Sequence, residues 1–291
     1  MFMRSMLFVP ADSPRKIEKG LGSGADAIIL DLEDSVAASA KEAARGIVRG
    51  VIADIAGRKA DVLPRIYVRV NALDTGLTAG DLKALEGLKV DGIMLPKSEG
   101  AASVRRLSAM IGAIEPAEHR GETRITVVAT ESAKALFGLG SYESAGPRLE
   151  GLSWGAEDLR TDIGARDNRG ADGRHTEPFR LARSLCLFGA VAAGVQPIDS
   201  VFPNFRDEAG LRLECDEALR DGFTGKLAIH PAQVPIINEM FTPSPEELAR
   251  AQAIVDAFAR AGDAGVIGLD GEMLDRPHLV HAQRLLARAG R

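Results

Sequence analysis

Short apolar segments that end in polar residues recur along the chain, and this pattern constrains the fold more than any other feature. The segments are nearly continuous in apolar residues rather than alternating, which is typical of strands covered on both faces, as in parallel sheets. Eight of them are candidate strands: MLFVP (6–10), AIILDLED (27–34), RIYVRVN (65–71), GIMLPK (92–97), ITVVATE (125–131), GLSWGAED (151–158), IDSVF (198–202) and GKLAIHP (225–231).

Segments with helical periodicity separate these strands, at 13–20, 38–53, 78–88, 101–114, 132–139, 177–194 and 207–221. The alternation predicts right-handed βαβ units. Eight such units that close on themselves form a (β/α)8 TIM barrel, for which roughly 250 residues is typical. The 291 residues therefore divide into an α/β barrel domain over 1–241 and a C-terminal helical segment over 242–291. In that segment Ser244 is the expected N-cap of a helix over 246–261, and a last helix covers 277–289.

Composition excludes several classes of protein. Lysine and arginine number 36 and the acidic residues 41, a formal charge of −5, which argues against a nucleic-acid partner. Cys186 and Cys215 are too few for a disulfide framework and are expected to be buried free thiols. The first residues lack the pattern of a signal peptide, and no apolar stretch is long enough to cross a bilayer. We therefore expect a cytoplasmic protein with no membrane partner.

Polar residues end the predicted strands, and in such barrels the chemistry gathers at the C-terminal ends of the strands. They are Asp31, Glu33, Asp34, Arg69, Asn71, Lys97, Glu131, Glu157, Asp158, Asn204 and His230. Glu131 and Asp158 end consecutive strands, which lie about 4.8 Å apart. Two carboxylates at that spacing repel unless a cation or a shared proton lies between them. Oxygen ligands favour Mg²⁺ over zinc. The alternative is that each acid caps the following helix or pairs with a lysine.

Two further residues carry open alternatives. Arg69 shares one strand face with Tyr67 and Asn71. If that face points inward, the guanidinium needs an anionic partner, which is either a structural carboxylate (Asp31 or Asp34) or a carboxylate or enolate of the substrate. Asp275, shortly before Pro277, has the pattern of a helix start and by itself predicts a cap.

In this order, the motifs LFVPADSPRK, IILDLEDSV, VRVN, LPK, the strand-end Glu131, WGAEDL and GEMLDRP resemble the HpcH/HpaI aldolase/citrate lyase family, in its citrate lyase β-subunit-like branch. The resemblance runs from Phe8 to about Leu286. It implies a barrel of the phosphoenolpyruvate/pyruvate type, a C-terminal lid, and a homo-oligomer, trimer or hexamer, in which the lid is exchanged between subunits.

The resemblance also implies roles for individual residues. Mg²⁺ is held by the residues that match Glu131 and Asp158, and the arginine that matches Arg69 contacts the reacting thioester. The aspartate that matches Asp275 arrives with the lid as a general acid/base. Contacts to the substrate or to coenzyme A are implied at Pro10, Arg15, Lys16, Asp34, Arg69, Glu131, Gly155, Ala156 and Glu157.

The expected activity is a Mg²⁺-dependent carbon–carbon lyase. It cleaves a 3-hydroxy-carboxyacyl-CoA such as malyl-CoA or citramalyl-CoA to an acyl-CoA and an α-keto acid. If water attacks the thioester instead, the same residues serve a malyl-CoA thioesterase. Two alternatives share the resemblance: a citrate lyase β subunit that acts on a citryl thioester bound to a carrier protein, and a silent regulator that binds CoA esters. A pyruvate-releasing aldolase is disfavoured by the DLED motif.

Overall fold

The computed structural model describes residues 2–57 and 63–290, and its larger part is a closed barrel of eight parallel strands. Each strand pairs with the next along the chain, and the eighth pairs with the first. The strands are Ser5–Pro10 (β1), Ala27–Asp31 (β2), Arg65–Arg69 (β3), Gly92–Leu95 (β4), Arg124–Val128 (β5), Leu149–Ser153 (β6), Gln196–Asp199 (β7) and Gly225–Ala228 (β8). The predicted (β/α)8 barrel is confirmed.

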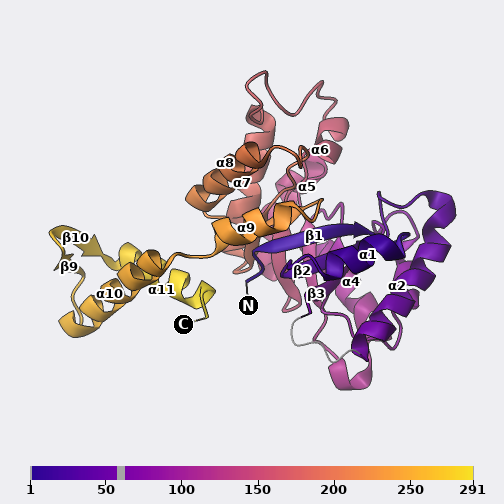
Figure 1. Ribbon diagram of the computed structural model, residues 1–291, viewed down its shortest axis with the longest axis horizontal. Helices are drawn as coiled ribbons and strands as arrows, with labels where there is room; N and C mark the ends of the chain where they lie inside the picture. The colour runs from indigo at the N-terminus through magenta and orange to yellow at the C-terminus, as the bar shows by residue number, and fades with distance from the viewer. Residues whose placement is uncertain (1, 58–62, 291) are drawn as a thin grey trace. The chain divides into compact units, whose positions relative to one another are not determined.

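Helices follow the strands and lie around them (Figure 1). The α-helices up to the end of the barrel are Pro14–Leu21 (α1), Lys41–Ala56 (α2), Thr78–Ala84 (α3), Ala101–Ile114 (α4), Ala133–Gly138 (α5), Glu157–Asp162 (α6), Glu177–Ala192 (α7), Glu208–Asp221 (α8) and Gln233–Phe241 (α9). Short 3-10 helices cover Ala38–Ala40 (η1), Ala117–His119 (η2) and Leu139–Ser144 (η3). Every strand is thus sheltered from solvent on its outer face, which explains its continuous apolar sequence.

Several predicted strands end too late. The sixth is expected from sequence to reach residue 158, but β6 ends at Ser153 and α6 starts at Glu157. The seventh and eighth run only over Gln196–Asp199 and Gly225–Ala228. Apolar residues continue past the last ladder hydrogen bond because the following loops are also buried, so hydrophobicity alone does not mark the end of a parallel strand.

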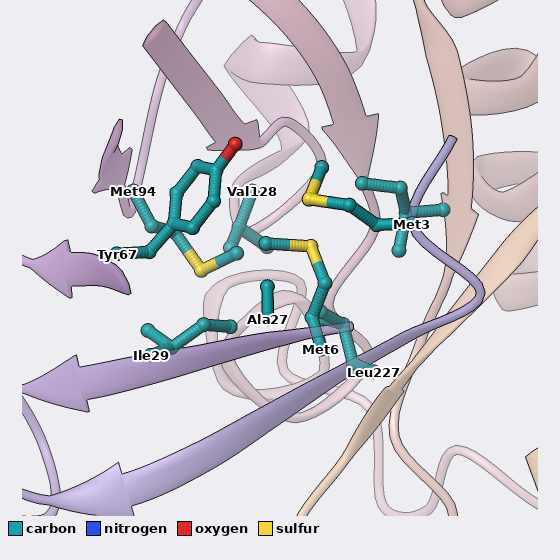
Figure 2. Close-up of a cluster of buried hydrophobic side chains, with 9 residues drawn as sticks. Met3, Met6, Ala27, Ile29, Tyr67, Met94, Val128 and Leu227 are labelled. Atoms are coloured by element: carbon teal, nitrogen blue, oxygen red, sulfur yellow. The ribbon is translucent and has the colours of Figure 1, made fainter. Parts of the chain in front are cut away.

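The barrel interior is filled by side chains from alternate strand positions (Figure 2). They belong to a buried cluster of Met3, Met6, Ala27, Ile29, Tyr67, Met94, Val128, Ile198 and Leu227. A glycine admits the largest of them: a Cβ atom on Gly92 would lie 2.1 Å from Cε1 of Tyr67. The Tyr67 hydroxyl bonds to Glu150, which also pairs with Arg65 at 3.1 Å. The interior is therefore a packed core, and the chemistry has to lie at its rim.

A buried ion cluster fastens the outer layer to the barrel. Asp199, at the end of β7, accepts hydrogen bonds from Lys226 Nζ at 2.7 Å, from Trp154 Nε1 at 2.7 Å and from Arg183 Nε at 3.2 Å. Burial alone would raise the pKa of Asp199, but Lys226 and Arg183 outweigh it and hold the pKa at about 2.

Both thiols, Cys186 and Cys215, are free and buried, as expected.

Phe2 and the chain from Glu239 to Gly290 form a second compact unit. Its elements are the end of α9, Pro245–Ala261 (α10), the strands Val266–Leu269 (β9) and Glu272–Asp275 (β10), and Arg276–Arg288 (α11). Helices α10 and α11 pack on each other through their own apolar cluster, which includes Leu248 and Leu286. Ser244 caps α10 as predicted, since its side chain accepts the N–H of Glu247 at 3.1 Å.

The antiparallel hairpin of β9 and β10 was not predicted. Asp270 and Gly271 join its strands, both with positive φ, and an Asp-Gly pair between two apolar segments is a strong hairpin signal. Over the described ranges, none of the helices is both long enough and apolar enough to cross a membrane.

We predict that Lys226→Met lowers the free energy of unfolding by about 3 kcal/mol or more, because it leaves the buried carboxylate of Asp199 without its main counter-charge. Denaturation in urea measures the change. The matched control is Lys134→Met, since Lys134 forms an exposed pair with Glu99 and should cost less than about 1 kcal/mol. Equal costs for the two variants would contradict a stabilising role of the buried cluster.

Candidate active site at the C-terminal rim of the barrel

Arg69 ends β3 opposite Asp31 of β2 in the strand register, so the barrel itself brings the two side chains together. Asp31 accepts two hydrogen bonds from the guanidinium, from Nε and Nη2, both at 2.7 Å, and Glu33 lies 2.9 Å from Nη1. The ring of Phe8 stacks 4.7 Å from the guanidinium carbon. Of the partners left open by the sequence, Asp31 is the one observed, and Glu33 rather than Asp34 is the second.

The charges of this pair support each other. Burial disfavours both ions, but the hydrogen bonds from Arg69 lower the pKa of Asp31. The same two carboxylates, Asp31 and Glu33, raise the pKa of Arg69 against the effect of burial. Arg69 therefore remains a fixed cation in a largely buried position, with its side chain only 13% exposed.

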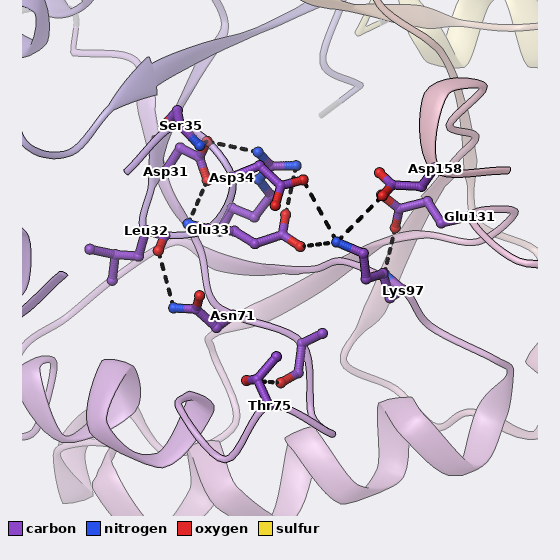
Figure 3. A network of polar contacts seen from close by, with 12 residues as sticks. Asp31, Leu32, Glu33, Asp34, Ser35, Asn71, Thr75, Lys97, Glu131 and Asp158 are labelled. Carbon is purple, nitrogen blue, oxygen red and sulfur yellow. Dashed lines mark hydrogen bonds and ion pairs between the residues drawn. The ribbon is translucent and has the colours of Figure 1, made fainter. Parts of the chain in front are cut away.

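Lys97, two residues after β4, occupies the centre of the rim (Figure 3). Its Nζ lies 2.7 Å from Glu33 Oε1, 3.6 Å from Asp158 Oδ1 and 3.7 Å from Asp34 Oδ2. Its backbone is left-handed, with φ 51°, a conformation that costs a non-glycine residue energy and that clusters at functional sites. The ammonium group thus lies between the Arg69 half of the site and the carboxylates beyond it.

Glu131 is the deepest of those carboxylates and lies three residues after β5. Its Oε2 accepts the backbone N–H of Lys97 at 2.5 Å. Gly155 permits this placement, since a Cβ there would lie 3.0 Å from Glu131 Cγ. Burial raises the pKa of Glu131 to about 8; Glu33 and Asp158 act in the same direction, whereas the N–H of Lys97 and Arg69 oppose the rise.

The prediction that Asp158 ends a strand is wrong, because Asp158 lies in the first turn of α6. Ala156 is the N-cap residue of this helix, and Glu157 accepts a hydrogen bond from Asn168 at 2.7 Å. A hydrogen bond of 3.1 Å from the N–H of Gly155 to Thr130 ties this loop to the one that carries Glu131. The two acids therefore meet at the rim through a loop and a helix start.

The donor set fits a hard divalent cation. Glu131 and Asp158 interact electrostatically and offer only oxygen atoms. No group of three or more histidine, cysteine or acidic side chains within residues 2–57 and 63–290 is arranged to hold a metal ion. Two carboxylates with water and substrate oxygens are a common environment for Mg²⁺, which keeps several of its waters.

Three other predicted residues belong to β1 and α1. Pro10 ends β1 beside Asp31 in the register. Arg15 and Lys16 are exposed in the first turn of α1, which holds no acidic residue. Within the part of the chain that the structure describes, no ion pair joins either of them to the carboxylates around Lys97.

Asp275 belongs to the second unit, where it is the N-cap residue of α11. Its Oδ1 lies 2.6 Å from Nδ1 of His278, and both side chains are half exposed. The capping position predicted from Pro277 is thus observed.

Glu33 and Lys97 stand out in the sequence only as residues at strand ends, yet they connect the whole site. The DLED and LPK motifs contain them, but a lysine in the left-handed conformation has no sequence signature. The role of Glu33 could not be predicted, because Asp31, Glu33 and Asp34 are equally plausible partners of an arginine on the next strand.

Comparisons with known proteins identify the family of this chain. A family model described as HpcH/HpaI aldolase/citrate lyase matches residues 4–231, and one for carbon–carbon bond lyases of the TIM-barrel fold matches residues 180–291. The chain belongs to the HpcH/HpaI aldolase/citrate lyase family. Its enzyme class is that of a carbon–carbon lyase.

Three relatives describe the range within the family. A (3S)-malyl-CoA thioesterase of Cereibacter sphaeroides is 36% identical over 98% of this chain and 94% of its own. An L-malyl-CoA/beta-methylmalyl-CoA lyase of the same species is 32% identical over 98% of this chain and 94% of its own. The crystal structure of CitE from Mycobacterium tuberculosis with magnesium, acetoacetate and coenzyme A is 35% identical, with a TM-score of 0.78 over 99% of this chain and 98% of that one.

We predict that Glu131→Gln changes the pH dependence of stability in EDTA. Between its ordinary pKa of 4.5 and about 8, Glu131 is ionised in the unfolded chain but protonated in the folded one. Raising the pH across this window therefore favours unfolding of the wild type, and glutamine removes this effect. The urea midpoint of the variant minus that of the wild type should grow up to about pH 8 and then level off.

The control for this pH series is Glu118→Gln, an exposed glutamate in η2. Its midpoint should follow the wild type at every pH. Parallel curves for Glu131→Gln and the wild type would show that Glu131 ionises normally.

Proposed function

We propose that this protein is a Mg²⁺-dependent lyase that cleaves a 3-hydroxy-carboxyacyl-CoA, such as malyl-CoA or citramalyl-CoA, to an acyl-CoA and an α-keto acid. The observation that carries the proposal is the gathering of Glu131 and Asp158 with Arg69 at one end of the barrel, with Lys97 between the two halves. The half with Glu131 and Asp158 suits a cation, and the half with Arg69 suits a developing anion.

Glu131 and Asp158 are the residues that would hold Mg²⁺. The ion supplies Lewis-acid chemistry, lowering the pKa of a bound hydroxyl and polarising a carbonyl. The all-oxygen donor set and the two carboxylates support this choice, as does the magnesium in the crystal structure of CitE. The α-hydroxy-acid part of the substrate, which becomes the keto acid, would lie on this side.

Arg69 is suited to the thioester side. A guanidinium has five N–H donors. Hydrogen bonds to Asp31 engage two of them, and Glu33 lies 2.9 Å from Nη1 as an ion pair. The remaining donors would serve the thioester oxygen, which becomes an enolate oxyanion when the C–C bond breaks. Because Asp31 and Glu33 hold the guanidinium in place before substrate binds, its charge is preorganised, which is the condition for strong electrostatic stabilisation.

Asp275 is proposed as the group that protonates the enolate carbon, and that removes the proton in the condensation direction. Its partly exposed carboxylate on a separate unit suits a residue that arrives with a lid over 242–291. We propose that this lid serves a homo-oligomer, a trimer or hexamer, in which lids are exchanged between subunits. Arg15 and Lys16 are the proposed contacts of the CoA phosphates, supported by their exposure in a helix turn without acidic residues.

Two other outcomes share this site. Attack of water on the thioester would make the chain a malyl-CoA thioesterase, which the name of one relative supports. A citrate lyase β subunit would act on a citryl thioester held by a carrier protein. The name of the lyase relative favours cleavage of a free CoA ester.

Assay of malyl-CoA, methylmalyl-CoA, citramalyl-CoA and citryl-CoA, with Mg²⁺ and with EDTA, tests the proposal. We expect acyl-CoA and keto acid to appear together from at least one ester, and only with Mg²⁺. Free CoA without keto acid would identify the thioesterase. Silence across the panel, with activity on a carrier-bound citryl group, would identify the citrate lyase subunit.

We predict that Asp275→Asn lowers turnover by about 10²-fold or more, the usual contribution of a general acid or base. Asparagine is as good an N-cap as aspartate, so the melting temperature should not change. Steady-state kinetics and thermal melting measure the two effects. Full activity together with a lower melting temperature would show that Asp275 only caps α11 and is not the general acid/base.

A further inference from the structure

We propose that Lys97 weakens the binding of a divalent cation to the substrate-free site and strengthens the binding of the anionic substrate, by placing a fixed positive charge between the two halves of the site. The inference rests on the proposed function, because it takes Glu131 and Asp158 as the cation ligands. It adds a role for a residue whose side chain and backbone both take part in the site.

The contacts of the ammonium group are unequal. Nζ donates a hydrogen bond to Glu33 at 2.7 Å, whereas Asp158 and Asp34 lie beyond hydrogen-bond distance at 3.6 and 3.7 Å. Lys97 is therefore anchored to Glu33, which also pairs with Arg69 at 2.9 Å. The ion pair with Asp158 is the longer one, so Asp158 can turn toward another cation while the ammonium stays at Glu33.

The backbone of Lys97 fixes the position of that charge. Its N–H binds Glu131, and it holds this position in the left-handed region, where glycine would be relaxed. A glycine would keep the N–H but would remove the ammonium. The strained backbone thus holds its N–H on Glu131, while the long side chain places a cation near Asp158, the other proposed metal ligand.

Coulomb's law then gives the sign of the effect. A positive charge close to Asp158 opposes a second cation there and attracts an anion. Divalent cations should bind weakly to the substrate-free site and more tightly once a keto-acid carboxylate adds its negative charge. Removal of the ammonium should strengthen binding of the cation alone and weaken binding of the anion.

Mn²⁺ binding, followed by its electron paramagnetic resonance signal with and without pyruvate, tests the inference on the full chain. In the wild type we expect pyruvate to tighten Mn²⁺ binding. In Lys97→Met we expect Mn²⁺ alone to bind at least tenfold more tightly than in the wild type, with a smaller gain from pyruvate. Lys97→Arg keeps the charge and should behave as the wild type does.

Controls separate charge from structure. Lys89→Met removes a lysine from an exposed pair with Glu122 and should leave Mn²⁺ binding unchanged. Lys97→Gln keeps a donor for Glu33 without the charge, and it decides the question if the methionine variant does not fold. Equal or weaker binding of Mn²⁺ by a folded neutral variant, or no effect of pyruvate on the wild type, overturns the role of Lys97.

The failure of the proposed function has a different signature. Glu131→Gln should abolish Mn²⁺ binding at this site in both the wild-type and the Lys97→Met background. If Mn²⁺ binds equally well without Glu131, then the cation site itself is wrong, whatever the Lys97 variants do.

Discussion

The excess of carboxylates over cations at one rim of the barrel is the constraint on which the rest of the site depends. Asp31, Glu33, Asp34, Glu131 and Asp158 meet there, and Arg69 and Lys97 are the cations among them. Like charges held this close destabilise a fold unless protons, partners or ions compensate. Three features compensate part of this charge: the bidentate pair of Arg69, the ammonium of Lys97 and the raised pKa of the buried Glu131. The negative charge that remains suits a divalent cation.

The closed barrel makes this gathering possible. The register places Arg69 beside Asp31 without any help from loops, and this part of the site was accessible from sequence because an arginine in an apolar strand must face an acid on a neighbour. The acids farther round the rim depend on loops. The sequence predicts Asp158 at the rim as a strand-end residue, but a short helix rather than a strand end brings it there.

What sequence patterns did not reveal was decided by packing and backbone conformation. The position of Lys97 follows from a left-handed residue and that of Glu131 from the close approach of Gly155, and neither leaves a periodic signal. The hairpin before α11 did have a signal, the Asp-Gly pair, which the glycine-rich composition obscured. Asp275 belongs to the smaller unit, which has its own apolar cluster, and it lies where β10 ends and α11 begins.

The hydrogen bond from Trp154 to Asp199 has a practical consequence. Trp154 is the only tryptophan of the chain. Its indole Nε1 donates to the buried Asp199, and the next residue along the chain is Gly155, whose lack of a Cβ makes room for Glu131. Its fluorescence is therefore a built-in reporter of the loop that leads to Asp158. A change of conformation in that loop, or the loss of the ion cluster behind it, will be visible in the emission of the unlabelled protein.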